Sequence, residues 1–337
     1  MKALVTAPFP KNELSRLKKR AEVVYKCWKV TGKFMSTGKL IKVIGDKEIL
    51  IVELQEVGEE VFRRCTNLKI MGCCRGNPLN VDLDAATKYG VPVIYTPARN
   101  AVAVAELTIA MMINIARNVG QSYLNLKKGK WNINNKDPFI YYKGRELNKK
   151  NVGLIGFGAV GVETAKRLRP FNTNILVYDP YVSEDFVKKY GAQKTSLEKL
   201  LKNSHFVSIH AKVTRETKSM FGKEEFKLMN KNAFLINTSR AILIEKTALI
   251  NALKNKQISG AALDVFYEEP VNPDDEILKL DNVLITPHIG GATFEIEERH
   301  AHIILNGLFK LLSGKLPENI ANPEVFKSNH LRKIRYE

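Results

Sequence analysis

Short apolar runs alternate with amphipathic segments along most of the sequence, and this alternation limits the possible folds more than any other feature. The runs KALVTA (2–7), EILIVEL (48–54) and LKIMGCC (68–74) have the length of buried strands, and polar segments of helical character separate them. A chain that alternates in this way forms βαβ units whose successive strands are parallel. The first hundred residues are therefore predicted to form an α/β sheet domain.

A second series of the same kind begins near Val152, after a nearly continuous apolar segment at 101–119 that predicts a buried helix. Because 337 residues are many for a single core, we expect two domains. A last helix is predicted at about 294–312, where the chain is expected to return to the first domain. The predicted fold is α/β, with two doubly wound parallel sheets. One domain comprises residues 1–100 plus about 292–337, and residues 101–291 form the inserted domain.

The chain is strongly basic, with 53 lysines and arginines against 35 acidic residues and a net charge of +18. These charges are scattered singly or in pairs, and no zinc-finger spacing or aromatic–basic RNA motif accompanies them. A nucleic-acid role is therefore not favoured, although the charge leaves it as one alternative. No apolar run reaches the ~18 residues of a membrane helix, and the first residues do not have the pattern of a signal peptide. The expected location is cytoplasmic.

Four cysteines, Cys27, Cys65, Cys73 and Cys74, invite a metal or redox interpretation. Metal sites usually use CxxC-type spacings with further cysteines or histidines, which this sequence lacks. Structural disulfides are rare in the cytosol. We predict that Cys73 and Cys74 are small apolar residues at the buried end of a strand, and we expect no metal site.

The segment VGLIGFGAVG contains Gly156, Gly158 and Gly161 in G-x-G-x-x-G spacing, between an apolar strand and an amphipathic helix. Such glycines let the backbone turn tightly and approach a pyrophosphate at a helix N-terminus. A second strand then ends at Asp179, whose carboxylate can accept hydrogen bonds from both ribose hydroxyls. A carboxylate at this point repels a 2′-phosphate. The motif therefore predicts a dinucleotide site that favours NAD over NADP.

Polar residues follow three further apolar strands: Arg240, Asp264 with Glu269, and His288. In an open α/β sheet, ligands bind outside the carboxyl ends of the strands, so these residues are expected to converge near the nicotinamide. Arginine can hold carboxylate and carbonyl oxygens, and histidine paired with a carboxylate can exchange a proton near neutral pH. These types suit hydride transfer between a 2-hydroxy acid and a 2-oxo acid.

With these residues in view, the chain resembles the D-isomer-specific 2-hydroxyacid dehydrogenase family over nearly its whole length. The segments that carry the resemblance include ATKYGVPVIYTPARNAVAVAE, LMNKNAFLINTSRAILIEKTALINAL, GAALDVFYEEP and NVLITPHIGGAT. The resemblance assigns catalytic roles to Arg240, Glu269 and His288. It assigns cofactor contacts to Gly156, Gly158, Ala159, Val160, Gly161, Asp179, His210, Ala211, Thr238, Asp264, His288, Gly290 and Gly291.

The resemblance further implies an NAD domain inserted in a flavodoxin-like substrate domain, with a cleft between them, and a homodimer formed through the NAD domain. Within this family, a phosphoglycerate dehydrogenase and a glyoxylate or hydroxypyruvate reductase are the activities that we consider for this chain. The 2-oxo acid and the physiological direction stay open at this point. The alternative is a non-enzymatic NAD-sensing protein with the same fold, similar to a corepressor. The presence of Arg240, Glu269 and His288 together argues instead for catalysis, because binding alone needs neither the general acid nor its partner.

Two departures from the family pattern concern loops. Lys212 follows His210 and Ala211 where the family usually has a proline. The loop after MGCC reads RGNPLNVD, and the resemblance assigns its carboxylate-binding amides to Gly76 and Asn77, beside Arg75. With Arg99 from TPARN, Arg75 suggests a substrate with a second anionic group. The alternative is that both arginines make structural or interdomain contacts.

Overall fold

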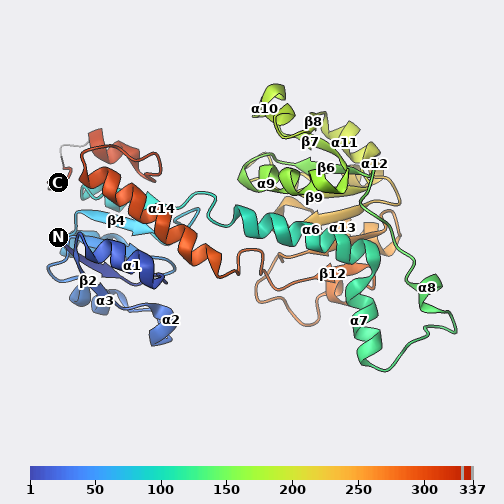
Figure 1. Cartoon of the computed structure of the whole chain (residues 1–337), viewed down its shortest axis with the longest axis horizontal. Coiled ribbons are helices and arrows are strands. Elements are labelled where there is room, and N and C mark those ends of the chain that lie inside the picture. Colours follow the sequence, from blue (N-terminus) through green and yellow to red (C-terminus); the bar gives the residue numbers. More distant parts are fainter. Residues whose placement is uncertain (328–329, 335–337) are drawn as a thin grey trace. The chain divides into compact units, whose positions relative to one another are not determined.

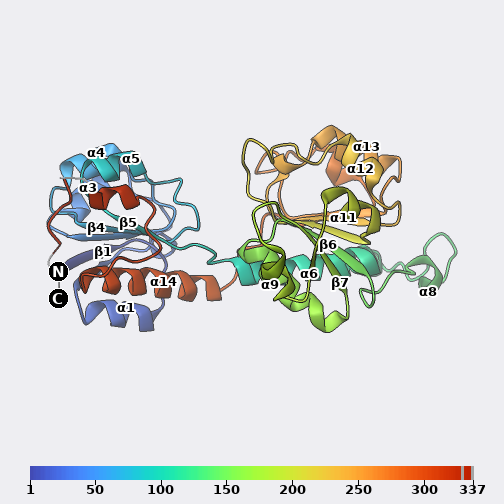
Figure 2. The same cartoon turned by 90° about the horizontal axis from the view of Figure 1, so that it is seen from above.

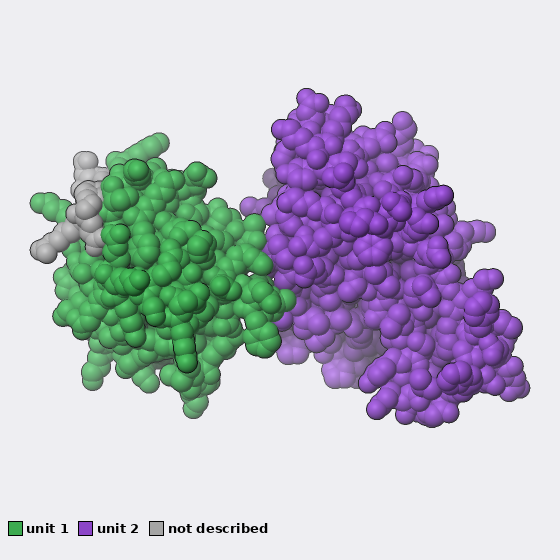
Figure 3. Space-filling model, viewed as in Figure 1, with its two compact units in different colours: residues 1–99, 293–337 green, residues 100–292 purple. Residues whose placement is uncertain are grey.

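The computed structural model describes residues 1–327 and 330–334, and it divides into two compact units. Unit 1 contains residues 1–99 and the C-terminal part of the chain from residue 293, and unit 2 contains residues 100–292 (Figure 3). Each unit is built around one parallel sheet.

The sheet of unit 1 has five parallel strands in the order β2-β1-β3-β4-β5. This 2-1-3-4-5 order is that of flavodoxin-like folds, in which ligands bind outside the carboxyl ends of the strands. The strands are β1 (Lys2–Val5), β2 (Glu22–Tyr25), β3 (Ile49–Val52), β4 (Ile70–Cys73) and β5 (Val93–Tyr95).

Helices cover both faces of this sheet because alternate side chains of its strands point to opposite faces. Ala3, Val5 and Ile51 pack on one face, under helices α1 and α14, whereas Leu4 and Leu50 pack on the other. Figure 2 shows α1 and α14 together on one side of the sheet, with α3, α4 and α5 on the other. The helices are α1 (Lys11–Lys18), α2 (Trp28–Thr31), α3 (Thr37–Ile44), α4 (Glu59–Arg64), α5 (Leu83–Lys88), α14 (Glu295–Leu312) and the 3₁₀ helix Pro323–Lys327.

Unit 2 has a seven-stranded parallel sheet in the order β12-β11-β10-β9-β6-β7-β8. The chain starts in the middle at β6 and builds outward first on one side and then on the other, so the order reverses between β6 and β9. Dinucleotides bind at such a reversal. The strands are β6 (Asn151–Ile155), β7 (Asn174–Tyr178), β8 (Gln193–Lys194), β9 (Phe206–Ile209), β10 (Phe234–Asn237), β11 (Gly260–Leu263) and β12 (Val283–Ile285).

The helices of unit 2 also form two layers, and α6 packs closely on α9 (Figure 1). Apolar residues of α6 and α9 share a core with one face of the sheet, and α11, α12 and α13 cover the other. The helices are α6 (Ala101–Arg117), α7 (Val119–Lys127), α8 (Pro138–Tyr141), α9 (Ala159–Leu168), α10 (Glu184–Lys188), α11 (Leu197–Asn203), α12 (Lys223–Leu228), α13 (Lys246–Lys254), and the 3₁₀ helices Arg169–Phe171, Ala241–Leu243 and Glu276–Lys279.

The predicted fold class, two α/β parallel sheets, is confirmed. Within the described part of the chain, no single helix has the length and hydropathy to cross a bilayer; α6 and α7 meet that test only as a pair bent by 65°.

Candidate active site

The glycine loop joins β6 to α9 and has the backbone conformation that its sequence predicts. Gly156 has a φ of +92°, and a Cβ atom there would lie 2.7 Å from the backbone nitrogen of Ala211. A Cβ at Gly161 would lie 2.4 Å from the carbonyl oxygen of Gly156, so both positions require glycine. A Cβ at Gly158, the N-cap of α9, would meet nothing within 4 Å. The first turn of α9, with Ala159 and Val160, is therefore open to a phosphate group.

Asp179 follows β7 and is fixed beside this loop. Its Oδ2 accepts a hydrogen bond of 2.7 Å from the backbone N–H of Phe157, and its Oδ1 accepts one of 2.9 Å from that of Tyr181. Each carboxylate oxygen keeps a further lone pair for a ribose hydroxyl.

A cavity of about 400 Å³ lies beside the glycine loop, entirely within unit 2. His210 lines it with its Nε2 3.0 Å from the Ser208 hydroxyl; Nδ1 is shielded from solvent and has no partner among the described residues. Burial lowers the pKa of His210 to about 4, so its imidazole is neutral at physiological pH. Of the predicted cofactor residues, this cavity is lined by Gly156, Gly158, Asp179, His210 and Ala211, and Lys212 also lines it. The residues present fit a dinucleotide.

His288 follows β12 and pairs with Glu269 from the loop after β11. The His288 Nδ1 and the Glu269 Oε2 are 2.6 Å apart, and the Glu269 Oε1 accepts a 3.0 Å hydrogen bond from the backbone N–H of Phe266. Burial acts to raise the pKa of Glu269, but the hydrogen bonds from His288 and Phe266 and the charge of Arg240 outweigh it and lower that pKa. Glu269 is therefore an ionised acceptor that holds the imidazole in one orientation.

Asp264 is 1% exposed and binds the loop that carries His288. Its carboxylate accepts hydrogen bonds from the Thr286 hydroxyl (2.6 Å) and from the backbone N–H groups of Ile289 and Gly290 (2.8 Å each). A Cβ at Gly290 would lie 2.9 Å from the Asp264 Oδ2, so glycine allows this close approach. These bonds flank His288 on both sides. The predicted cofactor contacts of Asp264, Gly290 and Gly291 stay predictions.

Arg240 lies in the loop after β10, and its side chain is exposed. Its Nη1 donates to the carbonyl oxygen of Ser239 (2.6 Å), and its own carbonyl accepts from the amide of Asn237 (3.0 Å). Since β10, β11 and β12 are neighbours, unit 2 places Arg240, Glu269 and His288 at one edge of its sheet. The buried hydroxyl of Thr238 bonds instead to Thr108 of α6, at 2.9 Å.

In unit 1, the loop after β4 exposes Gly76 and Asn77 and leaves Arg75 half-buried. Within the described part of the chain, the backbone N–H groups of Gly76 and Asn77 have no acceptor. Two free, adjacent amide donors suit a carboxylate ligand.

The side chain of Arg99, which is predicted to contact the substrate, is paired within unit 1. Its Nη1 lies 2.6 Å from the Glu53 Oε1 and 2.9 Å from the His300 Nδ1, and its side chain is only 17% exposed. A carboxylate already neutralises the guanidinium, so the alternative of a structural contact fits Arg99 better. Sequence reasoning missed Glu53 and His300, because neither belongs to a motif.

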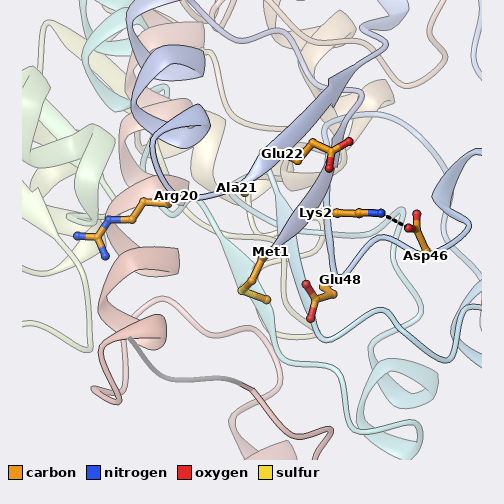
Figure 4. A pocket seen from close by; sticks show the side chains of 7 residues that line it. All are labelled: Met1, Lys2, Arg20, Ala21, Glu22, Asp46 and Glu48. Carbon is orange, nitrogen blue, oxygen red and sulfur yellow. Dashed lines mark hydrogen bonds and ion pairs between the residues drawn. The ribbon is translucent and has the colours of Figure 1, made fainter.

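The cysteines and a surface hollow near the N-terminus do not contribute to this site. All four cysteines are buried, and burial raises the pKa of the Cys73 thiol to about 12. A surface hollow around Met1, Glu22 and Glu48 lies at the amino ends of β1, β2 and β3, opposite the edge where ligands bind (Figure 4). Its acidic and basic side chains do not converge on one ligand, and Lys2 pairs with Asp46 instead.

The glycine loop, the acidic residue after β7 and the polar edge of β10–β12 define an NAD-binding oxidoreductase. Comparison with known proteins agrees: residues 109–290 match the model of the D-isomer specific 2-hydroxyacid dehydrogenase NAD-binding domain. The chain is 41% identical over 324 residues to YoaD of Bacillus subtilis, which is named as a 2-hydroxyacid dehydrogenase; the match covers 95% of this chain and 93% of YoaD. The chain belongs to the D-isomer specific 2-hydroxyacid dehydrogenase family.

Two further relatives are similar over nearly their whole length. A glyoxylate reductase of Thermofilum pendens is 36% identical, with 99% of this chain and 98% of that protein covered. The apo structure of D-lactate dehydrogenase from Escherichia coli has a similar fold, with a TM-score of 0.75, 26% sequence identity and coverage of 95% of this chain and 100% of that one.

Proposed function

We propose that this protein interconverts a 2-oxo acid and a D-2-hydroxy acid, with His288 as the acid–base group, Glu269 as its partner and Arg240 as the substrate anchor. The observation that carries the proposal is the 2.6 Å contact between the His288 Nδ1 and the ionised Glu269 carboxylate. Because Glu269 accepts the proton of Nδ1, the His288 Nε2 is the nitrogen left to exchange a proton with substrate.

In the direction of reduction, Arg240 holds the substrate's carboxylate and carbonyl oxygens through its fork of N–H donors. The glycine loop and Asp179 would hold NADH, which would supply the hydride that the carbonyl carbon accepts. The protonated imidazole of His288 gives its Nε2 proton to the developing alkoxide, and Glu269 stabilises the imidazolium before that transfer. In oxidation, the neutral imidazole takes the hydroxyl proton.

Unit 1 is proposed as the substrate domain, through the loop Arg75–Asn77. The free N–H groups of Gly76 and Asn77 support binding of the substrate carboxylate. The half-buried Arg75 beside them is proposed to bind a second anionic group where the substrate has one, such as a phosphate or a carboxylate.

Unit 2 is proposed to prefer NAD over NADP. Asp179 presents its carboxylate beside the glycine loop, fixed by two backbone N–H groups, where it accepts hydrogen bonds from ribose hydroxyls and repels a 2′-phosphate. The four free, buried cysteines suit a reducing compartment, which supports the expected cytoplasmic location.

A homodimer formed through unit 2 is also proposed. Residues 119–141, which include α7 and α8, expose several large apolar side chains, and a cluster of this kind marks an interaction surface. They are Val119, Tyr123, Leu124, Leu126, Trp131, Phe139 and Ile140. Sedimentation equilibrium of the wild type and of a Trp131→Ser/Phe139→Ser variant tests this surface; a monomeric wild type contradicts it.

The reaction is tested by following NADH oxidation with glyoxylate, hydroxypyruvate, pyruvate and a phosphorylated 2-oxo acid, with His288→Gln as the background. We expect turnover with at least one acid and loss of turnover in the variant. Tight NADH binding without turnover on any acid would instead support the NAD-sensing alternative. A preference for the phosphorylated acid that disappears in Arg75→Gln would support the second anionic group.

A further inference from the structure

Glu53, Arg99 and His300 form a largely buried polar cluster in unit 1 that the proposed reaction does not use directly. The Arg99 Nη1 contacts both the Glu53 Oε1 (2.6 Å) and the His300 Nδ1 (2.9 Å). The His300 Nε2 lies 2.7 Å from the carbonyl oxygen of Pro8, so this nitrogen carries the proton and Nδ1 accepts from Arg99. The exposed fractions of the three side chains are 11%, 17% and 0%.

The cluster connects loops that the sheet places on either side of β4. Glu53 directly follows β3, and Arg99 lies in the loop after β5. The strand between them in the sheet is β4, so the ion pair joins the two loops that flank its carboxyl end. His300, from α14, adds a link to the loop after β1 through Pro8.

The loop after β4 is itself attached to both flanking loops. At its start, the carbonyl oxygen of Arg75 accepts a 3.0 Å hydrogen bond from the N–H of Thr96, which follows β5. At its end, the amide of Asn80 donates to the carbonyl oxygens of Glu53 (3.1 Å) and Gln55 (2.7 Å), which follow β3. The Glu53–Arg99 pair completes a closed series of contacts, one segment of which is the loop with the exposed residues Gly76 and Asn77.

These contacts limit the separation of the loops after β3 and β5, and they need not add to the free energy of unfolding. Burying two charges has a desolvation cost that often cancels their attraction, so a buried ion pair is weak evidence for stability alone. Its directional bonds do limit how far the loops after β3 and β5 can separate. The loop between them then has little freedom to change the direction of its two amide donors.

We propose that Arg99 is a positioning residue, which through Glu53 and His300 holds the loop Arg75–Asn77 in the conformation that binds the substrate's carboxylate. The inference rests on the proposed function for the carboxylate but reassigns Arg99 from a substrate contact to a support for that contact. A specific geometry of the loop is needed because binding groups displaced by about 1 Å lose much of their effect.

Hydrogen exchange of the full-length protein without ligands tests the support independently of activity. The reporters are the amides of Leu79, Val81 and Thr96, which are hydrogen-bonded within or onto this loop. In Arg99→Gln we expect about tenfold faster exchange at these amides, with unchanged exchange in unit 2, and partial recovery in Arg99→Lys. The matched control is Arg64→Gln, which breaks an exposed Arg–Glu pair in the same unit and should leave the three amides unchanged.

Steady-state kinetics on the same variants test the consequence. Arg99→Gln and Glu53→Gln should each raise the KM for the 2-oxo acid about tenfold while the KM for NADH changes less than twofold. In the double variant, the KM for the 2-oxo acid should rise by less than the product of the two single increases, because no charge is left unpaired in the interior.

The outcomes separate the possibilities. A raised KM with wild-type exchange at the three amides means that Arg99 contacts substrate directly, and it overturns the positioning role. An unchanged KM, or faster exchange throughout unit 1 with equal losses for both substrates, also overturns it. If the wild type reduces no 2-oxo acid, the proposed function fails. Faster local exchange in Arg99→Gln would then still show that Arg99 holds the loop Arg75–Asn77, but the role of this loop in substrate binding would be refuted.

Discussion

The imidazole of His288 and the carboxylate of Glu269 lie 2.6 Å apart although they come from the loops after two different strands. Asp264, at the end of β11, binds the backbone on both sides of His288. The end of β11 therefore fixes the loop after β12 through Asp264. The loop after β11 also supplies Glu269, the partner of the imidazole. The orientation of the acid–base group is thus determined by bonds to the buried Asp264 carboxylate, although His288 and Glu269 are themselves partly exposed.

Replacing Glu269 with glutamine is expected to lower kcat by about 10²–10⁴-fold, the usual contribution of general acid–base catalysis. The neutral amide no longer stabilises the imidazolium, while the geometry of the loop is retained. The affinity for NADH, measured by fluorescence titration, should stay within about twofold. Glu268→Gln, which changes the exposed neighbouring residue, is the control; equal kcat in the two variants would refute the role of Glu269.

Replacing Asp264 with asparagine is expected to lower the free energy of unfolding by about 1–3 kcal/mol, since a donor of the His288 loop loses its buried acceptor. Activity should fall as well because the loop that carries His288 is less fixed. Urea unfolding followed by circular dichroism measures the change. Asp274→Asn, at a side chain that is 93% exposed, should stay within about 0.5 kcal/mol of the wild type. A stable but inactive Asp264→Asn would instead indicate a direct role in the reaction.

Local patterns predicted the sheets and the glycine loop because strands and phosphate loops depend on neighbouring residues. The alternation at 2–7 and 48–54 corresponds to β1 and β3, and the predicted helix at 294–312 corresponds to α14. By contrast, α3 was not predicted: Leu40, Ile41, Val43 and Ile44 form a short apolar cluster whose period is ambiguous.

The support around Arg99 could not be predicted, because it joins single polar residues that are far apart in the sequence. Arg99 and His300 are separated by 201 positions, and their contact depends on α14 returning to the first sheet. The bonds of Asp264 to the His288 loop likewise depend on β11 and β12 being neighbours. The residue types at the strand ends indicated where the site lies. The contacts of each residue could be identified only once the order of the strands in the sheet was known.

Replacing Asp179 with asparagine is expected to reduce the preference for NADH over NADPH, as a ratio of kcat/KM values, by at least about tenfold. The amide keeps one oxygen acceptor for the backbone N–H groups but no longer repels a 2′-phosphate. Kinetics with both cofactors and one 2-oxo acid measure the ratio. Asp185→Asn, at an exposed position of α10, is the control. An unchanged ratio in Asp179→Asn would place the discrimination elsewhere.

The half-buried His210, whose Nδ1 is shielded from solvent, predicts how stability depends on pH. Its pKa is about 6.5 in an unfolded chain and about 4 in the folded protein, because burial disfavours the charged imidazole. Between these values the unfolded state binds more protons, so acidification from pH 6.5 to 4 favours unfolding, by up to about 3 kcal/mol from this residue. Well above pH 6.5 the imidazole is neutral in both states, so the dependence on pH from this residue disappears there.

Urea unfolding of the wild type and of His210→Gln at pH 7, 5.5 and 4.5 tests this prediction. Because glutamine does not titrate, the variant should lose less stability than the wild type as the pH falls, and the difference should grow steadily toward pH 4.5. His302→Gln, at a histidine whose side chain is 56% exposed, should keep the wild-type dependence. Parallel curves for the wild type and His210→Gln would mean that His210 is accessible to protons in the folded state.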